Sequence, residues 1–454
     1  MRDIVIFLAL IGAAPVSFFM PYVGILTWAF ISYMNPQRLA FGFAADIPYA
    51  AIVGGATLIG LFVSREDTHF PRTPLTIVWI VFTAWMSFTT LFAIYPDLAF
   101  AKWVLVMKIM LMSFVTLLVM AKRERLNQLI WVIVLSLGFY GGKGGVFTLV
   151  RDTGGLTLVW GPENSFIADN NALALALVMA LPLMYYLQTT VTRKFIKYGM
   201  LALMALTVMG IVGTHSRGGF LALAAVILVV LLKSRYKARA LIVAAITAVG
   251  LVTVAPPAWM ERMENIENYE QDSSAMSRIN SWWTAYNLAN DRLLGGGFDT
   301  FNEEVFVRYA PNPSKVFNAH SIYFEVLGEH GYVGLILFLV LGLLALRTAT
   351  WIVRHTQERD DLKWARTLAS MTQISLIGYA VAGAFQNRAY FDLYYHIVGI
   401  LILTRVIVER SLAENVGESP AFGDNFDLAN GFGEGRARNF TFEKQHEEPP
   451  KWRE

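Results

Sequence analysis

Two arginines and a histidine have the chemistry needed to handle a phosphate-bearing substrate. Arg217 follows His215 and precedes two glycines, Arg278 opens a run of apolar and aromatic residues, and His320 stands just before another such run. Guanidinium groups bind phosphate oxygens bidentately and keep their charge at physiological pH. A histidine with an ordinary pKa of about 6.5 can take a proton from a hydroxyl. The set would suit transfer from a diphosphate donor, with the arginines stabilising the leaving group and the histidine acting as base.

Each of these residues also has an ordinary structural interpretation. Arg217 would lie at a membrane boundary, where arginines commonly extend to water. Arg278 could be a solvated charge on the polar face of a helix. A single histidine is more often structural than catalytic. The glycines beside Arg217 and the expected place of His320 at the lipid–water boundary favour the functional interpretation.

No metal or other cofactor is expected. The chain has no cysteine, which excludes a disulfide framework and a thiolate ligand. An Asp-x-Asp pair, which holds a metal in many membrane glycosyltransferases, does not occur on the outer side of the predicted topology, and the adjacent acids Asp360-Asp361 fall on the cytoplasmic side. The sequence therefore favours arginine over a metal for neutralising phosphate.

Further polar residues are predicted to bind substrate. Lys108 and Lys143 fall in the outer halves of predicted spans, where charges usually face a cavity or a partner, although each could extend outward to water instead. Glycines around Lys143 would allow a kink or close packing. Asp169 and Asn170 suit sugar hydroxyls, but Asp169 could equally be the N-cap of the next helix. His215, beside Arg217, completes this group.

The elements that must position these residues are membrane-spanning helices. Of 454 residues, 56% are hydrophobic and only 16% are charged, whereas a soluble domain has about a quarter charged residues. Roughly twenty apolar residues cross a bilayer as a helix, because backbone groups in lipid must bond to one another. The predicted spans are 48–64, 74–94, 103–121, 128–149, 171–188, 197–213, 217–232, 240–256, 331–348, 367–385 and 391–408.

Positive charge orients this all-α bundle. Lys/Arg clusters fall on every second connection, which the positive-inside rule places in the cytoplasm. Residues 4–34, interrupted by Pro15 and Pro21, would form one broken span or a re-entrant hairpin. If this region crosses once, the total is about twelve spans. The connections left on the outer side are 150–170, 214–217, 257–330 and 386–390.

Four regions follow from this reading. Residues 1–256 hold the N-terminal spans and residues 331–410 the C-terminal spans. The outer loop 257–330 is long enough to carry function. It includes an amphipathic helix near 277–285, expected on the outer membrane surface, and a glycine triplet that predicts only a turn. A helix after His320 is expected to break at Gly328 and Gly331. Residues 411–454, with few aliphatics, predict a disordered cytoplasmic tail.

Together these motifs resemble the signature of the O-antigen ligase and polymerase superfamily. The resemblance covers roughly residues 165–408 in order and spacing. The opening, from Met1 to Leu39, is similar to a subgroup labelled O-glycosylation ligases of exosortase-containing bacteria. The matching runs are Ser216-Arg217-Gly218-Gly219, Ser277-Arg278 through Trp283, Gly295-Gly296-Gly297-Phe298 to Phe301, and His320-Ser321 followed by Leu327-Gly328-Glu329-His330-Gly331 and Gly334.

The resemblance implies a GT-C-like fold and metal-independent transfer, with inversion, from undecaprenyl diphosphate on the periplasmic side of a bacterial inner membrane. Arg217 and Arg278 would bind the diphosphate, and His320 would activate the acceptor. In O-antigen ligases that acceptor is the sugar core of lipid A. The expected partners are thus the lipid-linked glycan, lipid A-core or a protein, and membrane lipids, but no nucleic acid. Ser321 departs from the Asn that commonly follows the histidine, so a hydroxyl replaces an amide at this expected substrate contact.

An O-antigen ligase is the leading hypothesis, but relatives with the same donor stay open. These are a protein O-glycosylation ligase and an O-antigen polymerase, because nothing in the sequence reads the acceptor directly. A transporter of lipid-linked sugars would predict ionisable residues near the bilayer midplane and paired repeats. Here the charges gather in the outer half and no repeat is visible. A purely structural scaffold would not require the Arg–His set.

Overall fold

The computed structural model describes helices and connecting loops, without a strand among the described residues. Two units divide the chain, Met1–Glu409 and Arg410–Glu454. Within the second, the described residues 410–416 are helical, so the prediction of disorder is wrong for 411–416; the rest of the predicted tail lies outside the described residues. The structure describes residues 2–40, 42–64, 66, 68–150, 158–233, 238, 241 and 273–416.

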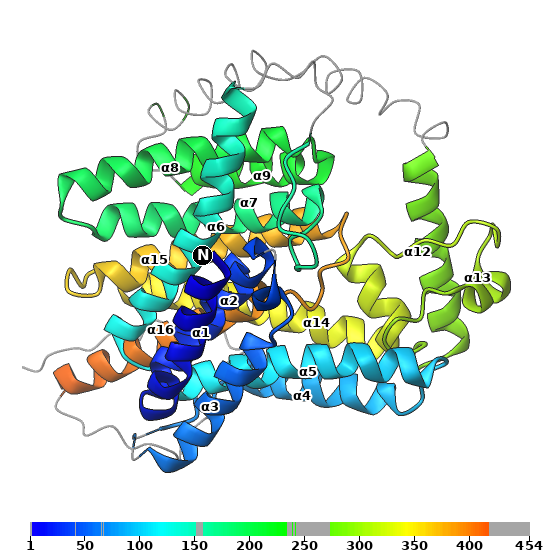
Figure 1. Cartoon of the computed structure of the whole chain (residues 1–454), viewed down its shortest axis with the longest axis horizontal. Coiled ribbons are helices and arrows are strands. Elements are labelled where there is room, and N and C mark those ends of the chain that lie inside the picture. Colours follow the sequence, from blue (N-terminus) through cyan, green and yellow to red (C-terminus); the bar gives the residue numbers. More distant parts are fainter. Residues whose placement is uncertain are drawn as a thin grey trace, which may run out of the picture. The chain divides into compact units, whose positions relative to one another are not determined.

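Figure 1 shows how the helices are arranged. They are α1 (Arg2–Phe19), α2 (Pro21–Met34), η1 (Pro36–Leu39), η2 (Phe43–Ala45), α3 (Tyr49–Val63), α4 (Pro74–Thr90), α5 (Pro96–Val119), α6 (Arg123–Val150), α7 (Asn170–Thr190), α8 (Lys194–Gly213), α9 (Arg217–Lys233), α12 (Ser273–Asp291), α13 (Glu303–Tyr309), α14 (Ile322–His355), α15 (Lys363–Gly383) and α16 (Asp392–Val416).

The chain is a multi-pass membrane protein. Every span predicted in the described part of the chain has a helix at its position, and the ends differ most at α5, α14 and α16. The span predicted at 240–256 lies outside the described residues, apart from Leu241. Over the described ranges, six helices are long and apolar enough to cross a membrane: α1, α5, α6, α7, α8 and α14. Two shorter apolar helices, α3 and α4, accompany them.

The N-terminal region forms two helices instead of one continuous span. Met20 separates α1 from α2, and Pro21 takes the first position of α2, where its missing N–H costs nothing. Helix α3 packs closely on α1 because Gly60 has no side chain: a Cβ there would lie 2.1 Å from the carbonyl oxygen of Phe18. The interruption predicted at Pro21 is confirmed, but Pro15 lies inside α1, so an interruption there is wrong.

Glycines also allow α6 and α8 to pack closely against each other. A Cβ at Gly145 would lie 2.0 Å from the carbonyl oxygen of Leu206, and one at Gly141 would meet the side chain of Thr207. Helix α6 runs without interruption past Lys143, so these glycines provide close packing and no kink.

Helix α14 consists of two parts that meet at Gly331. This glycine has φ 65° and ψ −169°, a left-handed conformation that a side chain would oppose. The break predicted at Gly331 is confirmed, but Gly328 lies inside the first part, so a break there is wrong. The last carbonyls of the first part bond outside the helix, as helix ends require. Gly296 N donates to Gly328 O (2.8 Å), Gly297 N to Glu329 O (2.9 Å) and Trp85 Nε1 to His330 O (3.0 Å).

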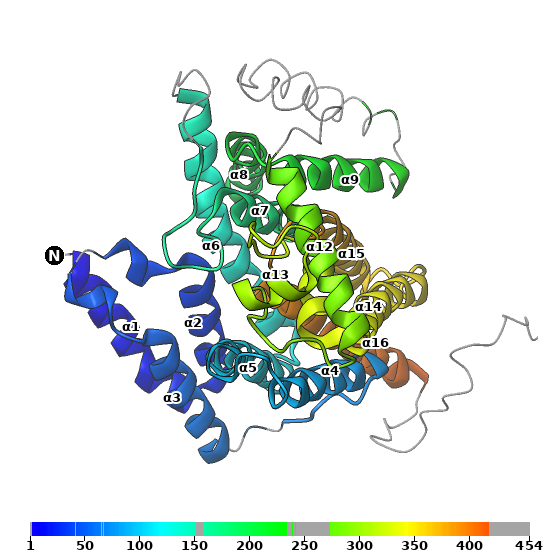
Figure 2. The same cartoon turned by 90° about the vertical axis from the view of Figure 1, so that its right-hand side faces the viewer.

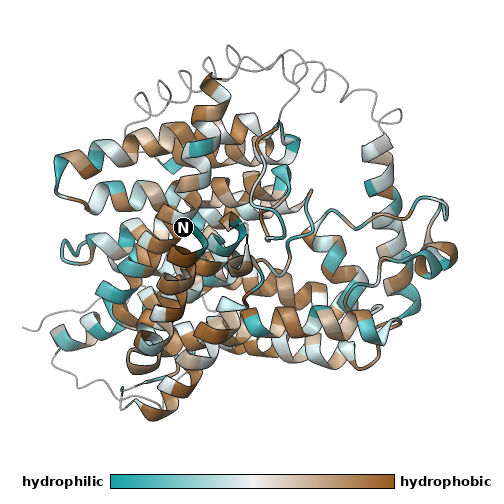
Figure 3. Ribbon diagram, viewed as in Figure 1, coloured by the Kyte–Doolittle hydropathy of each residue, from teal (hydrophilic) through white to brown (hydrophobic). Residues whose placement is uncertain are grey.

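The connections predicted on the outer side meet at one end of the bundle. Val159 N donates to Gly213 O at 2.9 Å, and Arg388 Nε donates to Phe166 O at 2.7 Å. Helix α12 runs across this end, transverse to α4 and α5 (Figures 1 and 2). Hydrophobic residues dominate the bundle helices, whereas α12 and α13 carry a more mixed set (Figure 3). The loops that hold the candidate residues are therefore neighbours in space.

Candidate active site

Arg278 and His320 face a common pocket of about 510 Å³ at this end of the bundle. Arg278 comes from the first turns of α12, and His320 stands just before α14. An arginine and the histidine that the sequence predicts to act together thus line the same pocket. The other lining residues are Ser274, Ser277, Ser314, Lys315, Val316 and Phe317.

Three successive residues of α12 hold the loop that leads to His320. Asn280 Nδ2 donates to the carbonyl oxygens of Asn312 (2.9 Å) and Lys315 (3.2 Å), and Asn280 Oδ1 accepts from Asn312 N (2.9 Å). Ser281 Oγ donates to Phe317 O (3.0 Å), and Trp282 Nε1 donates to Ala319 O (2.8 Å). The loop from residue 312 to 319 is therefore fastened to the helix that carries Arg278.

His320 itself is half-buried and adopts a φ of 45°, which is uncommon for a residue with a side chain. Burial lowers its pKa from the ordinary value, and the nearby positive charge of Arg278 lowers it further. Asp169 and Glu325 raise the pKa, and Arg388 lowers it, but the net shift is downward. A lowered pKa keeps the imidazole neutral near pH 7, in the form that can accept a proton.

Asp169 is held by two partners. Its Oδ1 accepts from Ala172 N at 2.8 Å, which confirms the N-cap interpretation. Its Oδ2 pairs with Arg388 Nη2 at 2.7 Å. The sequence reasoning missed Arg388, although an arginine in a connection predicted on the outer side runs against the charge bias of the other connections.

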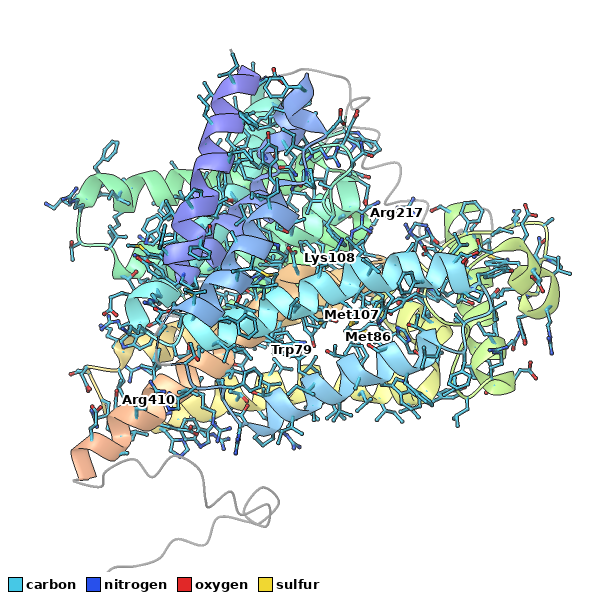
Figure 4. The ribbon with its side chains drawn as sticks, turned by 60° about the horizontal axis from the view of Figure 1, so that its bottom comes forward. Trp79, Met86, Met107, Lys108, Arg217 and Arg410 are labelled. Carbon is cyan, nitrogen blue, oxygen red and sulfur yellow. The ribbon has the colours of Figure 1, made fainter. Side chains whose placement is uncertain are left out.

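Arg217 lies at the same end but does not line the pocket. It opens α9, where Ser216 Oγ accepts from Gly219 N at 3.0 Å (Figure 4). The preceding turn is fixed by Asn170, whose Nδ2 donates to Thr214 O at 2.7 Å. His215 in this turn is buried and has a φ of 53°. The turn that precedes Arg217 is therefore hydrogen-bonded to the start of α7.

The remaining predicted contacts lie elsewhere. Ser321 takes the N-cap position of α14 and is buried, and it does not line the pocket. Lys143 is exposed on α6. Lys108 is exposed on α5, twelve residues after Pro96 and eleven before Val119, so it lies near the middle of the helix (Figure 4). The structure does not bring either lysine to the pocket.

A cluster around Lys102 was not predicted. Lys102 Nζ lies 2.7 Å from Glu329 Oε1, 3.1 Å from Glu325 Oε1 and 3.5 Å from Asp299 Oδ1. Both glutamates are buried and lie one turn apart in the first part of α14. Two acids four residues apart in an otherwise apolar helix were the available signal, because buried carboxylates need a partner.

The cluster also binds the loop before α16. Ala389 N donates to Glu325 Oε2 at 3.1 Å, and the hydroxyl of Tyr390 donates to Glu329 Oε2 at 2.7 Å. Because Ala389 follows Arg388, the cluster fixes the backbone beside the ion pair with Asp169.

In the ranges described, no group of three or more His, Asp or Glu side chains is placed to hold a metal ion.

The fold and this site define an all-helical, multi-pass membrane protein with a polar pocket at one end of its bundle. Residues 201–339 match the family model described as O-Antigen ligase, and residues 1–192 match a family of unknown function. No curated protein matches the chain. The O-antigen ligase segment includes Arg217, Arg278 and His320. It supports the ligase and polymerase superfamily and an enzyme of the glycosyl-transfer type, acting on a lipid-linked glycan and an acceptor.

Proposed function

We propose that the chain is an O-antigen ligase, which transfers a glycan from undecaprenyl diphosphate to the lipid A-core oligosaccharide on the periplasmic face of the inner membrane. The observation that carries this proposal is the pocket shared by Arg278 and His320. The pocket lies at one end of a multi-pass bundle, within the segment that matches the O-antigen ligase model.

In the proposed reaction an acceptor hydroxyl attacks the anomeric carbon of the donor. The imidazole of His320 takes the hydroxyl proton as the new glycosidic bond forms, and the bond from the anomeric carbon to the diphosphate oxygen breaks. The bonding electrons leave with the diphosphate, whose growing charge the Arg278 guanidinium stabilises. Direct displacement inverts the anomeric carbon and needs no metal. The proton on His320 then passes to solvent.

Arg217 would be a second ligand of the diphosphate. Its loop adjoins the site, because a Cβ at the next residue, Gly218, would lie 3.2 Å from the side chain of Phe385, in the loop that leads to Arg388. Asp169, Asn170 and His215 belong to the same group of loops, and we propose them as contacts for a glycan that extends beyond the pocket. Lys108, Lys143 and Ser321 have no role in the proposed site, because they do not line the pocket.

The architecture proposed with this function is a GT-C-like bundle of about twelve spans. Residues 257–330 would form its periplasmic loop, between the N-terminal spans of 1–256 and the C-terminal spans of 331–410. The charge bias of the connections and the meeting of the outer connections at the pocket support this topology.

The test is transfer in vitro with purified protein, an undecaprenyl-diphosphate glycan and lipid A-core. We expect glycan-capped lipopolysaccharide, lost in Arg278→Ala and His320→Ala. Arg308→Ala is the matched control, because Arg308 is an exposed arginine of α13 that pairs with Asp291 and does not line the pocket. That variant should keep full activity.

Other outcomes separate the alternatives. Lipid A-core that stays bare while glycan appears on a protein, or lengthens on its carrier, would replace the acceptor and leave the donor chemistry standing. Movement of the donor across vesicles without any transfer would overturn the ligase and indicate a transporter.

A further inference from the structure

One face of α12 is exposed although it carries large apolar and aromatic side chains. Trp283 is 52% exposed, and Met276 and Tyr286 are also exposed. They lie seven and three residues from Trp283, a spacing that places all three on one side of a helix. The opposite side holds the buried Ser277 and Ser281 and faces the pocket. That side also buries the apolar Ala285 and Leu288 against the rest of the protein. The exposed rings therefore form a second apolar face, which the protein itself does not cover.

This exposed face continues into a stripe on α14. The hydroxyl of Tyr332 donates to Asn290 Oδ1 of α12 at 2.8 Å, just after the break at Gly331. From Tyr332 the same face of α14 carries Ile336, Leu339 and Leu343, all exposed, with Ile336 at 58%. Exposed apolar side chains on a spanning helix face lipid tails. The aromatic face of α12 therefore begins where the lipid-facing stripe of α14 ends.

We propose that α12 rests on the membrane surface at the pocket end, with Trp283, Tyr286 and Tyr332 at the level of the lipid headgroups. Trp and Tyr have an apolar ring and a polar group, which suits a boundary that is apolar on one side and wet on the other. The transverse course of α12 across the ends of α4 and α5 fits a helix that lies along the surface (Figures 1 and 2).

The position of α12 has a consequence for the pocket on its other face. Because Arg278 projects from the same helix, the depth of α12 in the headgroup layer sets the level of this guanidinium. This step rests on the proposed function: the diphosphate of a lipid-linked donor lies at that same level, so Arg278 meets it without lifting the lipid from the bilayer.

The chain has no cysteine, so a single introduced cysteine can be labelled without background. We would attach a nitroxide to Trp283→Cys and Tyr286→Cys in the full-length protein, in vesicles of phosphatidylethanolamine and phosphatidylglycerol. Electron paramagnetic resonance then compares collisions with oxygen, which concentrates in lipid, and with a water-soluble nickel chelate. Leu339→Cys provides a lipid-tail reference, and Val307→Cys on α13, 70% exposed, provides a water reference.

We expect the labels at 283 and 286 to collide with oxygen more than the label at 307 does, and with nickel more than the label at 339 does. Nickel accessibility at 283 equal to that at 307 would place the face in water and overturn the proposal. Exclusion of both reagents would show that protein, such as a second copy of the chain, covers the face, and would overturn it as well. No outcome depends on glycan transfer, so failure here is distinct from failure of the proposed function.

Discussion

Arg388 and Asp169 form an ion pair, with Nη2 and Oδ2 2.7 Å apart, that joins the loop before α7 to the loop before α16. The two members of the pair have opposite effects on the pKa of His320: Asp169 raises it and Arg388 lowers it. Burial and Arg278 outweigh the carboxylates, so the pKa of His320 stays below its ordinary value. The electrostatics of the proposed base are thus set by residues from four separate segments.

The pH dependence of transfer should reflect this lowered pKa. A base works only while it is neutral, so activity should persist below about pH 6.5, the ordinary pKa of histidine, and fall only as His320 becomes protonated. Asp169→Asn removes a charge that raises the pKa and leaves Arg388 uncompensated, and both changes lower the pKa further. The acid limb of the kcat/KM profile, which reports the pKa of the free enzyme, should therefore move to lower pH.

Asp291→Asn is the control for the pH profile. Asp291 is a carboxylate at the end of α12 that pairs with Arg308, and its removal should leave the acid limb in place. An acid limb above about pH 6.5 in the parent protein, or a shift toward higher pH in Asp169→Asn, would contradict the assignment of His320 as the base.

Asn280 is expected to act as a positioning residue. Asn280→Ala removes three hydrogen bonds to the loop that ends at His320, which lets the imidazole drift from the acceptor. Misplacement of this kind can lower the rate by about 10²-fold. We expect a fall in kcat of about 10- to 100-fold with little change in the KM for the donor, measured in the transfer assay.

Asn287→Ala is a matched control for Asn280→Ala. Asn287 lies on the same helix and donates to the carbonyl oxygen of Tyr309, on α13, at 2.8 Å. It therefore loses a bond of the same kind without touching the loop before His320. Equal losses of kcat in the two variants would mean that Asn280 matters only for the stability of α12.

Lys102 should matter for stability. Lys102→Met leaves Glu325 and Glu329 buried beside each other without their cation, and loss of one partner from a buried ion pair costs about 3–5 kcal/mol. Thermal unfolding of Lys102→Met in detergent should show a clear drop in Tm. Lys102→Arg keeps the positive charge and should show a smaller drop. Lys108→Met changes an exposed lysine of the same helix and should leave the Tm nearly unchanged. An unchanged Tm in Lys102→Met would show that the glutamates are neutral or otherwise satisfied.

Removal of divalent metal should leave transfer intact, because the arginines neutralise the diphosphate in the proposed mechanism. The measurement is the initial rate after treatment with EDTA, compared with a sample to which Mg²⁺ has been added back. Loss of activity that Mg²⁺ or Mn²⁺ restores would overturn this part of the mechanism.

The helices could be predicted because each span is a continuous run of apolar residues. The break in α14 could be predicted because a glycine, Gly331, stands at that position in the sequence. The charge bias of the connections is also readable along the chain. It grouped the loops that the structure brings together at one end. Local pattern does not reveal which charged residue in a span has a partner. The sequence left open whether Lys108 and Lys143 face a cavity or extend outward to water, and both are exposed.

The partners that sequence reasoning missed are far apart in the chain. Lys102 bonds Glu325 and Glu329 across 223 and 227 positions, and Arg388 bonds Asp169 across 219. Such pairs depend on how the helices pack, which no short motif encodes. The fastening of the loop before His320 by Asn280, Ser281 and Trp282 was hidden for another reason. Side-chain bonds to backbone carbonyls leave no pattern in the residues that accept them.

The Lys102 cluster also limits how this protein can change by recombination. Lys102 lies in the segment that matches a family of unknown function, the two glutamates lie in the O-antigen ligase segment, and Tyr390 lies beyond both. A hybrid that took its first half from a relative without the lysine would inherit two buried carboxylates with no cation. The two halves are therefore expected to pass between lineages together, as a single heritable module.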